Sequence, residues 1–444
     1  MSDELASALE ERLGGGEVRD LKRLSGGASR ETWSFELARP GGDVEPMILQ
    51  RDRAGAVRTG GGMATEAAIL VAAAQAGVPV PKLRLDATDG LIGQPAFVTD
   101  RIEGETIPRR ILRDDAYASA RPLLAAQCGR VLAAIHRIPP ASVAGLEQQD
   151  QVTQFRDVLD SFDEPHPAFE LGFRWLEANR PPPTRTVIVH GDFRNGNMIV
   201  GPDGIRAVLD WELAHLGDPM EDLGWLCVRA WRFGSKLPVG GFGERSDLFA
   251  AYGEAAGVEV DPKVARWWEV LGTLKWGVMC IIQAASHLHG LTRSVELAAI
   301  GRRVCENEHD LLTLIAPPSP TPSAAPGPAA TSSGLHGRPT VGELVEAVRE
   351  FLERDVMTGT EGRLQFHARV AVNALKIVER ELELGGAMAA AHEARLATLG
   401  YADDAALASA IRAGKLDDRI DEVTAAVQAS VLDKVLVANP KYLD

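Results

Sequence analysis

The sequence predicts an α+β protein with a small N-terminal lobe rich in antiparallel sheet, a larger and mainly helical lobe, and an all-α accessory domain. Short β-like runs separated by turns dominate to about residue 102, and helical composition dominates from about residue 116. Residues 317–337 are rich in Pro, Ala, Ser and Gly. At 444 residues with 45% hydrophobic content, the chain can build two or three cores. We therefore expect four parts: 1–102, 103–316, the linker 317–337 and 338–444.

The first lobe is expected to contain strands and one helix. They are a pair of strands within 18–37, a third strand at 46–51, a helix at 64–75 and a short strand at 97–101. The first two strands are joined by a glycine-containing turn formed by Ser25, Gly26, Gly27, Ala28 and Ser29. Glu66 lies in the first turn of the helix.

The C-terminal part is expected to be a separate helical domain with no motif that implies chemistry. The linker before it can neither hold a helix nor pack a core, because Pro and Gly recur throughout. Thr340 and Glu343 then form a capping box. A second helix is expected at 362–384, ending at Gly385 and Gly386.

Composition narrows the possible partners and location. The 62 acidic residues exceed the 47 basic ones, and the resulting net charge of −15 argues against nucleic acid as the main partner. The four cysteines lack metal-type spacing, which is typical of free thiols in the cytoplasm. The N-terminus does not have the order of a signal peptide. The apolar segment 264–289 carries charges and is expected to be a core helix, with no membrane insertion.

The strongest motif is VIVHGDFRNGNMIV at residues 187–200. A strand ending at Val189 delivers His190, Gly191 and Asp192 into a loop, and 198–200 leaves as a strand. A turn at 201–204 predicts a hairpin with 207–209, which returns Asp210 to the loop. Asp192, Asn197 and Asp210 then converge, and their oxygen atoms suit Mg2+.

The order H-x-D-x-x-x-x-N, hairpin, Asp is the layout by which kinases hold a catalytic Asp and two metal ligands. Here the sequence resembles the aminoglycoside phosphotransferase and choline kinase-like small-molecule kinases, whose HGDxxxxN signature appears as residues 190–197. The continuation VLDWELAHLGDPMEDLGWL, residues 208–226, is similar to the branch associated with acyl-CoA dehydrogenases. The resemblance covers about residues 20–315. It implies a bilobal protein-kinase-like fold and transfer of the ATP γ-phosphoryl group to a hydroxyl.

The resemblance also implies roles for individual residues. Asp192 is the catalytic base, Arg194 stabilises charge on the transferred group, and Asn197 and Asp210 hold Mg2+ across the ATP phosphates. The turn at 25–29 covers those phosphates. We expect His190 to support the loop, and Asp218 and Asp222 to cap the next helix.

One position departs from the family pattern. The family places a Lys or Arg on the third strand to grip the phosphates and pair with a helix acid, and MILQR offers Gln50 or Arg51 there. Neighbouring strand residues point to opposite faces, so only one of the two enters the cleft. We favour Arg51, with Glu66 as its partner.

The acceptor is less defined by the sequence. Arg229 and Arg232 follow the expected metal site and suit an anionic acceptor. The branch resemblance implies a hydroxylated acyl-CoA, and we hypothesise a partnership with an acyl-CoA dehydrogenase.

Two alternatives stay open at this level. A catalytically weak module that binds a nucleotide or acyl-CoA for regulation fits the ambiguity at Gln50. A metal-dependent phosphoesterase would need further His and Asp ligands, and the region 210–222 supplies only His215 and a few carboxylates.

Overall fold

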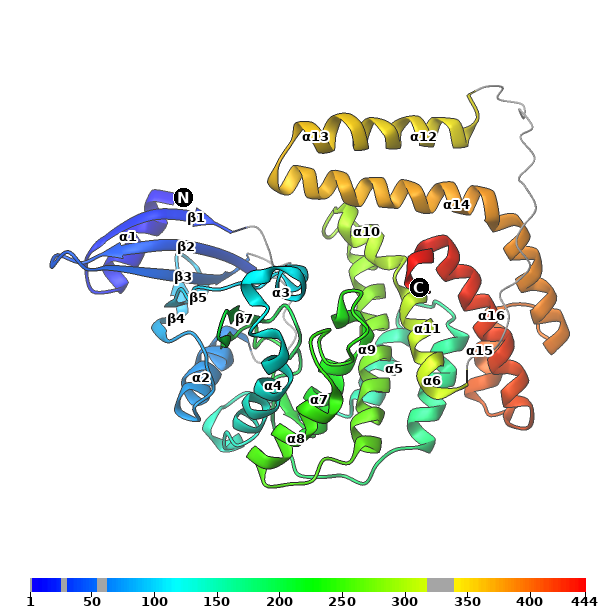
Figure 1. Ribbon diagram of the computed structural model, residues 1–444, viewed down its shortest axis with the longest axis horizontal. Coiled ribbons are helices and arrows are strands. Elements are labelled where there is room, and N and C mark those ends of the chain that lie inside the picture. Colours follow the sequence, from blue (N-terminus) through cyan, green and yellow to red (C-terminus); the bar gives the residue numbers. More distant parts are fainter. Residues whose placement is uncertain (1, 25–29, 54–61, 318–338) are drawn as a thin grey trace. The chain divides into compact units, whose positions relative to one another are not determined.

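The computed structural model describes residues 2–24, 30–53, 62–317 and 339–444 (Figure 1). Contacts divide the chain into two compact units: Met1–Gln149 with Pro181–Glu269, and Asp150–Arg180 with Val270–Asp444. Helix α9, Pro262–Leu288, belongs partly to each unit. The two units are defined by contacts between residues, whereas the four parts expected from the sequence were defined by composition. The boundaries of those four parts therefore stay a prediction. The expected turn at 25–29 and nearly all of the expected linker lie outside the described residues.

The first unit begins with a five-stranded antiparallel sheet in the order β1-β2-β3-β5-β4. Its strands are β1 (Glu17–Arg23), β2 (Arg30–Ala38), β3 (Val44–Asp52), β4 (Leu83–Leu91) and β5 (Gln94–Asp100). The sequence analysis omitted β4, although Leu83, Leu85 and Ala87 alternate with polar residues as in a half-buried strand.

The two faces of this sheet belong to different cores. On one face, Met47 and Leu49 pack in a core with Leu5 and Leu9 of α1 (Ser2–Arg12). On the other face, Phe97 of β5 packs with residues of α2 (Gly62–Gln75). The side chains of β3 alternate between these faces, and this alternation decides which residues of β3 can approach α2.

The rest of the first unit is helical except for two small two-stranded sheets. Its helices are α3 (Pro108–Arg113), α4 (Arg121–Ile135), α7 (Met220–Cys227), α8 (Arg245–Ala256), the start of α9, and the 3-10 helices η1 (Asp115–Tyr117), η2 (Pro140–Ser142) and η3 (Arg229–Arg232). One small sheet pairs β6 (Val187–Val189) with β9 (His215–Gly217), and the other pairs β7 (Met198–Gly201) with β8 (Gly204–Val208). The second pair is the hairpin expected from the sequence.

Among its described residues, the second unit contains helices joined by turns and loops and no strand. It contains the remainder of α9, α5 (Gln151–Asp160), α6 (Pro167–Ala178), α10 (Val295–Gly301), α11 (Val304–Ile315), α12 (Val341–Phe351), α13 (Met357–Gly359), α14 (Gly362–Leu399), α15 (Asp404–Arg412), α16 (Ile420–Ala438), the π-turn η4 (Leu352–Val356), and the 3-10 turns η5 (Asp417–Arg419) and η6 (Pro440–Tyr442). Residues of α15 and α16 share one core with residues of α6 and α11. The Thr340 and Glu343 capping box begins α12, as expected.

Helix α14 corrects one prediction. The second helix of this region does not end at Gly385 and Gly386 but continues through both to Leu399, a length of 38 residues. Glycine inside a helix costs only about 1 kcal/mol relative to alanine. The Ala-rich segment that follows, AMAAAHEARLATL, favours the helical state enough to offset this cost. The chain therefore keeps two glycines in the middle of a long helix.

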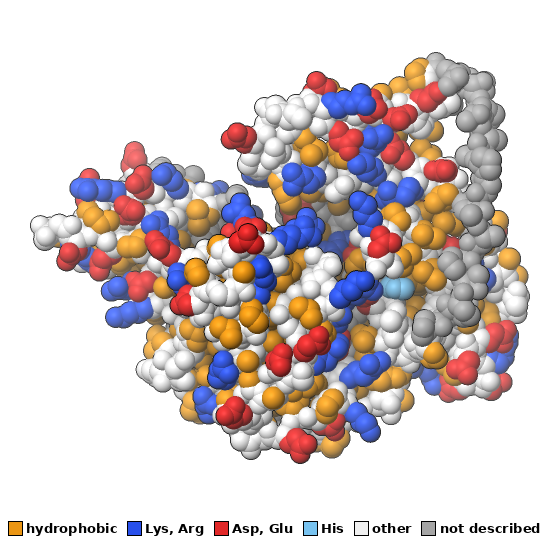
Figure 2. Space-filling model, viewed as in Figure 1, with side chains coloured by type: hydrophobic (Ala, Val, Ile, Leu, Met, Phe, Trp, Pro, Cys, Tyr) orange, Lys and Arg blue, Asp and Glu red, His pale blue; other side chains and the backbone are white. Residues whose placement is uncertain are grey.

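The surface carries charges of both signs. Figure 2 shows acidic and basic side chains interspersed over the face in view, as a net charge of −15 from 109 ionised side chains allows. Within the described ranges, no helix combines the length and apolar character required to span a bilayer.

Candidate functional site

The HGD loop begins where the buried strand β6 ends, and the imidazole of His190 supports it from within. Nε2 donates to the carbonyl oxygen of Leu209 at 3.0 Å, and Nδ1 accepts the backbone N–H of Asp192 at 3.2 Å. Burial lowers the pKa of His190 although the carboxylates of Asp222 and Asp192 act to raise it. The neutral imidazole therefore holds the loop against the end of the β7–β8 hairpin, as expected from the sequence.

Asp222 anchors the same loop from α7. Its Oδ2 accepts the backbone N–H of His190 at 2.8 Å, and its Oδ1 accepts that of Gly191 at 2.9 Å. His136, the residue that follows α4, lies 3.1 Å from Oδ2. Gly191 has φ of 76°, and a Cβ there would collide with the Leu213 carbonyl oxygen, so only glycine fits.

The expected capping role is therefore wrong for Asp222 and right for Asp218. Asp222 is fully buried, and its carboxylate is occupied by the loop instead of the start of α7. Burial would raise the pKa of Asp222, but the hydrogen bond and charge of His136 and the backbone N–H of His190 lower it below its ordinary value. Asp218 accepts the N–H of Met220 at 2.8 Å, at the beginning of the helix.

Three donors orient the carboxylate of Asp192. Asn197 Nδ2 donates to Oδ2 at 2.6 Å, Arg194 Nε donates to Oδ1 at 3.1 Å, and Trp225 Nε1 donates to Oδ1 at 2.9 Å. Trp225 was not among the site residues expected from the sequence. A signal was present, because Trp225 lies three residues after Asp222 on α7 and so shares its face toward the loop.

Arg194 is held beside Asp192 by an aromatic ring as well. Its guanidinium carbon lies 4.7 Å from the centroid of the Trp231 ring, a cation–π distance. The rings of Trp231 and Trp225 are 5.1 Å apart. One aromatic pair thus fixes the expected base and the expected phosphoryl-stabilising cation together.

Asn197 and Asp210 both lie at the end of the hairpin that β7 and β8 form. The backbone N–H of Leu209 donates to the carbonyl oxygen of Asn197 at 2.9 Å, which brings the next residue, Asp210, to the loop. The side-chain nitrogen of Asn197 must face Asp192, because an ionised carboxylate only accepts. The amide oxygen of Asn197 is then the atom that remains for a ligand.

Asp210 occupies a strained and crowded position. Its φ is 66°, a left-handed conformation that costs roughly 1 kcal/mol and that Asp tolerates better than most residues. Burial, followed by the charges of Glu212, Asp192 and Glu66, raises the pKa of Asp210 to about 7. Several carboxylates therefore repel one another here, and a cation would relieve that repulsion.

The donor set fits Mg2+, which prefers oxygen ligands and completes its shell with water and phosphate oxygens. The Asn197 amide oxygen and the Asp210 carboxylate would be the protein ligands. Across the described residues, no three His, Cys, Asp or Glu side chains group as a complete metal site. Two protein ligands would leave the other coordination positions of the ion to water and phosphate oxygens.

The partner of Glu66 differs from the one expected. Arg30 of β2 donates to both carboxylate oxygens of Glu66, with Nη1 at 2.5 Å from Oε2, so the expected pairing with Arg51 is wrong. Arg30 also lies 3.7 Å from Glu212 and 3.9 Å from Asp52. Burial raises the pKa of Glu66, and Arg30 opposes this shift. The ion pair therefore links the sheet and α2 to the segment that carries Asp210.

Strand register explains this correction. Gln50 is paired with Thr32 and Phe97, and it shares their face, which is the face toward α2. Arg51 is on the opposite face, where Nη2 donates to the Ile92 carbonyl oxygen at 2.8 Å. The neutral Gln50 takes the position expected for a cation.

The two arginines expected to meet the acceptor both lie in η3. Arg232 donates to the Cys227 carbonyl oxygen at 2.7 Å and to Glu269 at 3.0 Å, so its charge is compensated within the unit. Arg245 contacts the same carboxylate at 2.7 Å. This geometry gives Arg232 a structural role, and the acceptor contact expected of Arg229 stays a prediction.

Sequence comparisons agree with this site. Residues 20–268 match the family model described as the phosphotransferase enzyme family (APH), and residues 358–442 match a domain of unknown function (DUF6285). Acyl-CoA dehydrogenase family member 10 of Mus musculus is 29% identical over 238 residues, which are 50% of this chain and 21% of that protein. Family member 11 of Pongo abelii is 30% identical over 163 residues, 33% of this chain and 20% of that protein. The chain thus spans about a fifth of the length of these curated relatives.

Structural comparisons establish the fold. A Ralstonia eutropha protein provisionally described as an aminoglycoside phosphotransferase superposes with a TM-score of 0.58 and 20% identity, over 71% of this chain and 98% of that one. The aminoglycoside phosphotransferase APH(4)-Ia gives a TM-score of 0.50 and 16% identity, over 71% and 98%. The expected protein-kinase-like fold with its additional C-terminal helical region is confirmed. Since the family model covers more than half of the sequence, the chain belongs to the phosphotransferase enzyme family.

Proposed function

We propose that the protein is an ATP- and Mg2+-dependent small-molecule kinase that transfers the γ-phosphoryl group to a hydroxyl of its acceptor. The observation that carries this proposal is the orientation of Asp192. Its two carboxylate oxygens are fixed by Asn197, Arg194 and Trp225, while the hairpin returns Asp210 to the same point. Positioning of this kind supplies most of the catalysis in phosphoryl transfer.

The proposed reaction uses these residues directly. Asp192 accepts a hydrogen bond from the acceptor hydroxyl and takes its proton as the oxygen bonds to the γ-phosphorus. The bond between that phosphorus and the β–γ bridging oxygen breaks, and ADP leaves. Arg194 stabilises charge on the transferred group. Asn197 and Asp210 would hold Mg2+, which when bound neutralises phosphate charge.

Arg30 is proposed as the cation that contacts the ATP phosphates. It lies on the face of the sheet toward α2, pairs with Glu66 and approaches Glu212. A kinase normally takes this cation from its third strand, paired with a helix acid. Here the third strand offers Gln50, and the neighbouring strand supplies the charge. The residues 25–29 remain the proposed cover for the phosphates.

The acceptor is proposed to be a hydroxyacyl-CoA. The likeness to acyl-CoA dehydrogenase family members supports this acceptor and a functional partnership with such a dehydrogenase. Arg229 is the proposed contact for an anionic part of the acceptor. We also propose a cytoplasmic location, which the four free and buried cysteines support.

A second function is favoured by one observation. Gln50 stands where a cation is expected, so a module that binds a nucleotide or acyl-CoA with little catalysis is the alternative. The two functions separate in one experiment. The protein is incubated with an acyl-CoA extract, ATP and Mg2+, and the products are analysed by mass spectrometry beside Asp192→Asn.

An acceptor that gains one phosphoryl group only with the unmutated protein supports the kinase. Unchanged acceptors together with calorimetric binding of ATP support the regulatory module. If ATP does not bind the unmutated protein in the presence of Mg2+, the kinase proposal fails; if acyl-CoA does not bind either, the regulatory module fails as well.

A further inference from the structure

The second unit contains a cavity that is open to solvent and lies far in sequence from the HGD loop. It has a volume of about 340 Å³ and lies among α10, α11, α14 and α16. Ligand sites are typically several hundred Å³ with mainly apolar walls. A cavity of this size therefore suggests a ligand.

One part of the cavity wall is apolar. Its lining includes Val304, Met388, Ala389, Val437 and Ala438, which come from α11, α14 and α16. Such a surface would accept a hydrocarbon chain, because burial of apolar area stabilises a complex by roughly 25 cal/mol per Å².

The charged residues on the wall are matched among themselves. Arg395 donates to Asp433 at 2.6 Å, Lys434 lies 3.6 Å from Glu308, and Arg302 is paired with Glu381. Each pair joins two lining residues of opposite charge. A charged ligand group of either sign would lose its hydration and meet a charge that already has its counterion.

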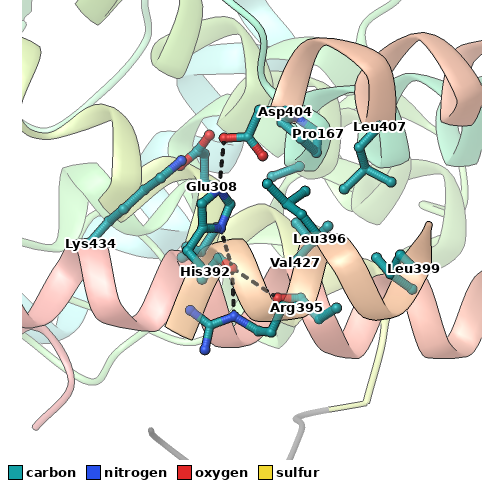
Figure 3. A pocket seen from close by; sticks show the side chains of 14 residues that line it. Pro167, Glu308, His392, Arg395, Leu396, Leu399, Asp404, Leu407, Val427 and Lys434 are labelled. Atoms are coloured by element: carbon teal, nitrogen blue, oxygen red, sulfur yellow. Dashed lines mark hydrogen bonds and ion pairs between the residues drawn. The ribbon is translucent and has the colours of Figure 1, made fainter. Parts of the chain in front are cut away.

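A polar cluster occupies one end of the cavity. Ser430 Oγ accepts from Arg395 Nε at 2.9 Å and lies 2.9 Å from His392 Nδ1. His392 Nε2 is 3.4 Å from Asp404. The same cluster borders a second, smaller cavity of about 20 Å³, shown in Figure 3, whose far side is lined by Leu396, Leu399 and Leu407. His392 keeps 29% of its side chain exposed, so it can contact a polar group in the cavity.

Gly385 helps to form the cavity. It lines the wall from the middle of α14, where alanine or leucine would stabilise the helix by about 1 kcal/mol. A Cβ at Gly385 would meet only the Glu381 Cγ, at 3.6 Å, so a larger side chain fits the helix and would extend from the wall. Glycine at this position thus leaves space at a cost to the helix.

We propose that this cavity binds an uncharged amphipathic small molecule. Its alkyl chain lies along the apolar wall, and an alcohol or amide group hydrogen-bonds to His392 and Ser430. This site is independent of the proposed kinase reaction, because all of its lining residues belong to the second unit.

The test uses three probes that differ only in their head group: 1-octanol, octanoate and octylammonium. Binding to the full chain is measured by ligand-observed NMR titration. We expect 1-octanol to bind at least five-fold more tightly than either charged probe. Equal or tighter binding of octanoate or octylammonium would overturn the choice of an uncharged ligand. A failure of all three probes to bind would overturn the site.

Two neighbouring glycines locate the binding. Gly385→Leu places a side chain in the cavity and should weaken octanol binding at least ten-fold. Gly386→Leu is the matched control, since Gly386 is exposed, is absent from the lining residues of both cavities and would gain the same helix propensity. It should change the affinity less than two-fold. Octanol binding that survives in Gly385→Leu, with the helical circular dichroism signal intact, would overturn the proposed position.

The head-group contact has its own variant. Ser430→Ala removes a hydroxyl but little volume. It should weaken octanol binding about three-fold or more, while the contacts between the alkyl chain and the apolar wall remain. Equal affinity of Ser430→Ala and the unmutated protein for octanol would exclude Ser430 from the head-group site.

Discussion

Arg30 on β2 donates to both carboxylate oxygens of Glu66 on α2, and Gln50 lies on the same face of the sheet. Only 12% of the Arg30 side chain and 6% of the Glu66 side chain is exposed, so solvent screens the pair weakly. The helix acid therefore has a cation, but the cation comes from the strand beside the expected one. Phosphate binding at this face would depend on Arg30.

The variant Arg30→Gln tests this dependence. We expect ATP to bind at least ten-fold more weakly, since a charge-assisted hydrogen bond contributes about 1.5 to 3 kcal/mol. The variant should also lose about 3 kcal/mol of unfolding free energy, because Glu66 would stay buried without its partner. Isothermal titration calorimetry with Mg2+ and ATP measures the first effect, and urea denaturation measures the second.

A double variant separates folding from binding. Arg30→Gln with Glu66→Gln removes both charges and should recover most of the stability while ATP binding stays weak. Adding Gln50→Arg to this background would return a cation to the same face and should restore part of the affinity. ATP binding by the double variant at the affinity of the unmutated protein would contradict the role of Arg30.

Trp225 is expected to position Asp192 without contacting a substrate. Trp225→Phe keeps the ring but removes the N–H that donates to Asp192 Oδ1, and kcat should fall about ten-fold with KM for ATP nearly unchanged. Steady-state kinetics on the acceptor found by mass spectrometry would measure this. Trp33→Phe in the N-terminal sheet is the control and should leave kcat within two-fold. A ten-fold rise in the KM for ATP with no fall in kcat would contradict the positioning role.

The geometry of the HGD loop and its hairpin was predictable because the residues that determine it are close together in the sequence. The signature at 190–197 and the turn at 201–204 determine the loop and hairpin within about twenty residues, so Asp192, Asn197 and Asp210 come together as expected. The partner of Glu66 was not predictable in this way. Arg30 lies 36 positions from Glu66, and its approach depends on the register of β2 with β3. Composition does not specify such a register.

The same limit applies to the helices. Asp222 looks like a capping residue, and only the packing of α7 against the loop directs its carboxylate to two backbone N–H groups. Gly385 and Gly386 look like a helix end, yet the Ala-rich continuation extends α14 through them. A contact between distant segments overrides the local preference of Asp222, whereas the helix propensity of the residues that follow offsets that of the two glycines.

Asp222 is expected to make a large contribution to stability. Asp222→Asn would place its amide NH2 against one of the two backbone N–H groups, of His190 or Gly191, that the carboxylate accepts, and should lower the unfolding free energy by about 2 to 3 kcal/mol at pH 7. Asp218→Asn, at the start of α7, is the control and should cost less than about 1 kcal/mol. Urea denaturation compares the two, and similar losses would contradict the anchoring role.

The contribution of Asp222 also depends on pH. Its pKa in the folded protein is lower than the ordinary value, so its stabilisation is fully present above about pH 4, the ordinary pKa of Asp. It is lost as pH falls through the folded value. The difference in unfolding free energy between Asp222→Asn and the unmutated protein should therefore shrink below pH 4. A difference that grows as pH falls would contradict this linkage.

Asp210→Asn is expected to lower activity and to raise stability. The substitution retains a residue that tolerates the left-handed backbone, so the loop should keep its conformation. It removes one of the carboxylates that repel one another near Glu66, Asp192 and Glu212, and without divalent cations the variant should be more stable by roughly 1 to 2 kcal/mol.

The variant should also lose a proposed Mg2+ ligand, so Mg2+ would stabilise the unmutated protein bound to ATP more than the variant. Thermal unfolding in EDTA and in Mg2+ with ATP measures both effects. A variant that is less stable than the unmutated protein in EDTA would show that the Asp210 carboxylate is not a source of repulsion. A variant whose stability increases as much with Mg2+ and ATP as that of the unmutated protein would show that Asp210 is not a metal ligand, and the metal would then lie elsewhere.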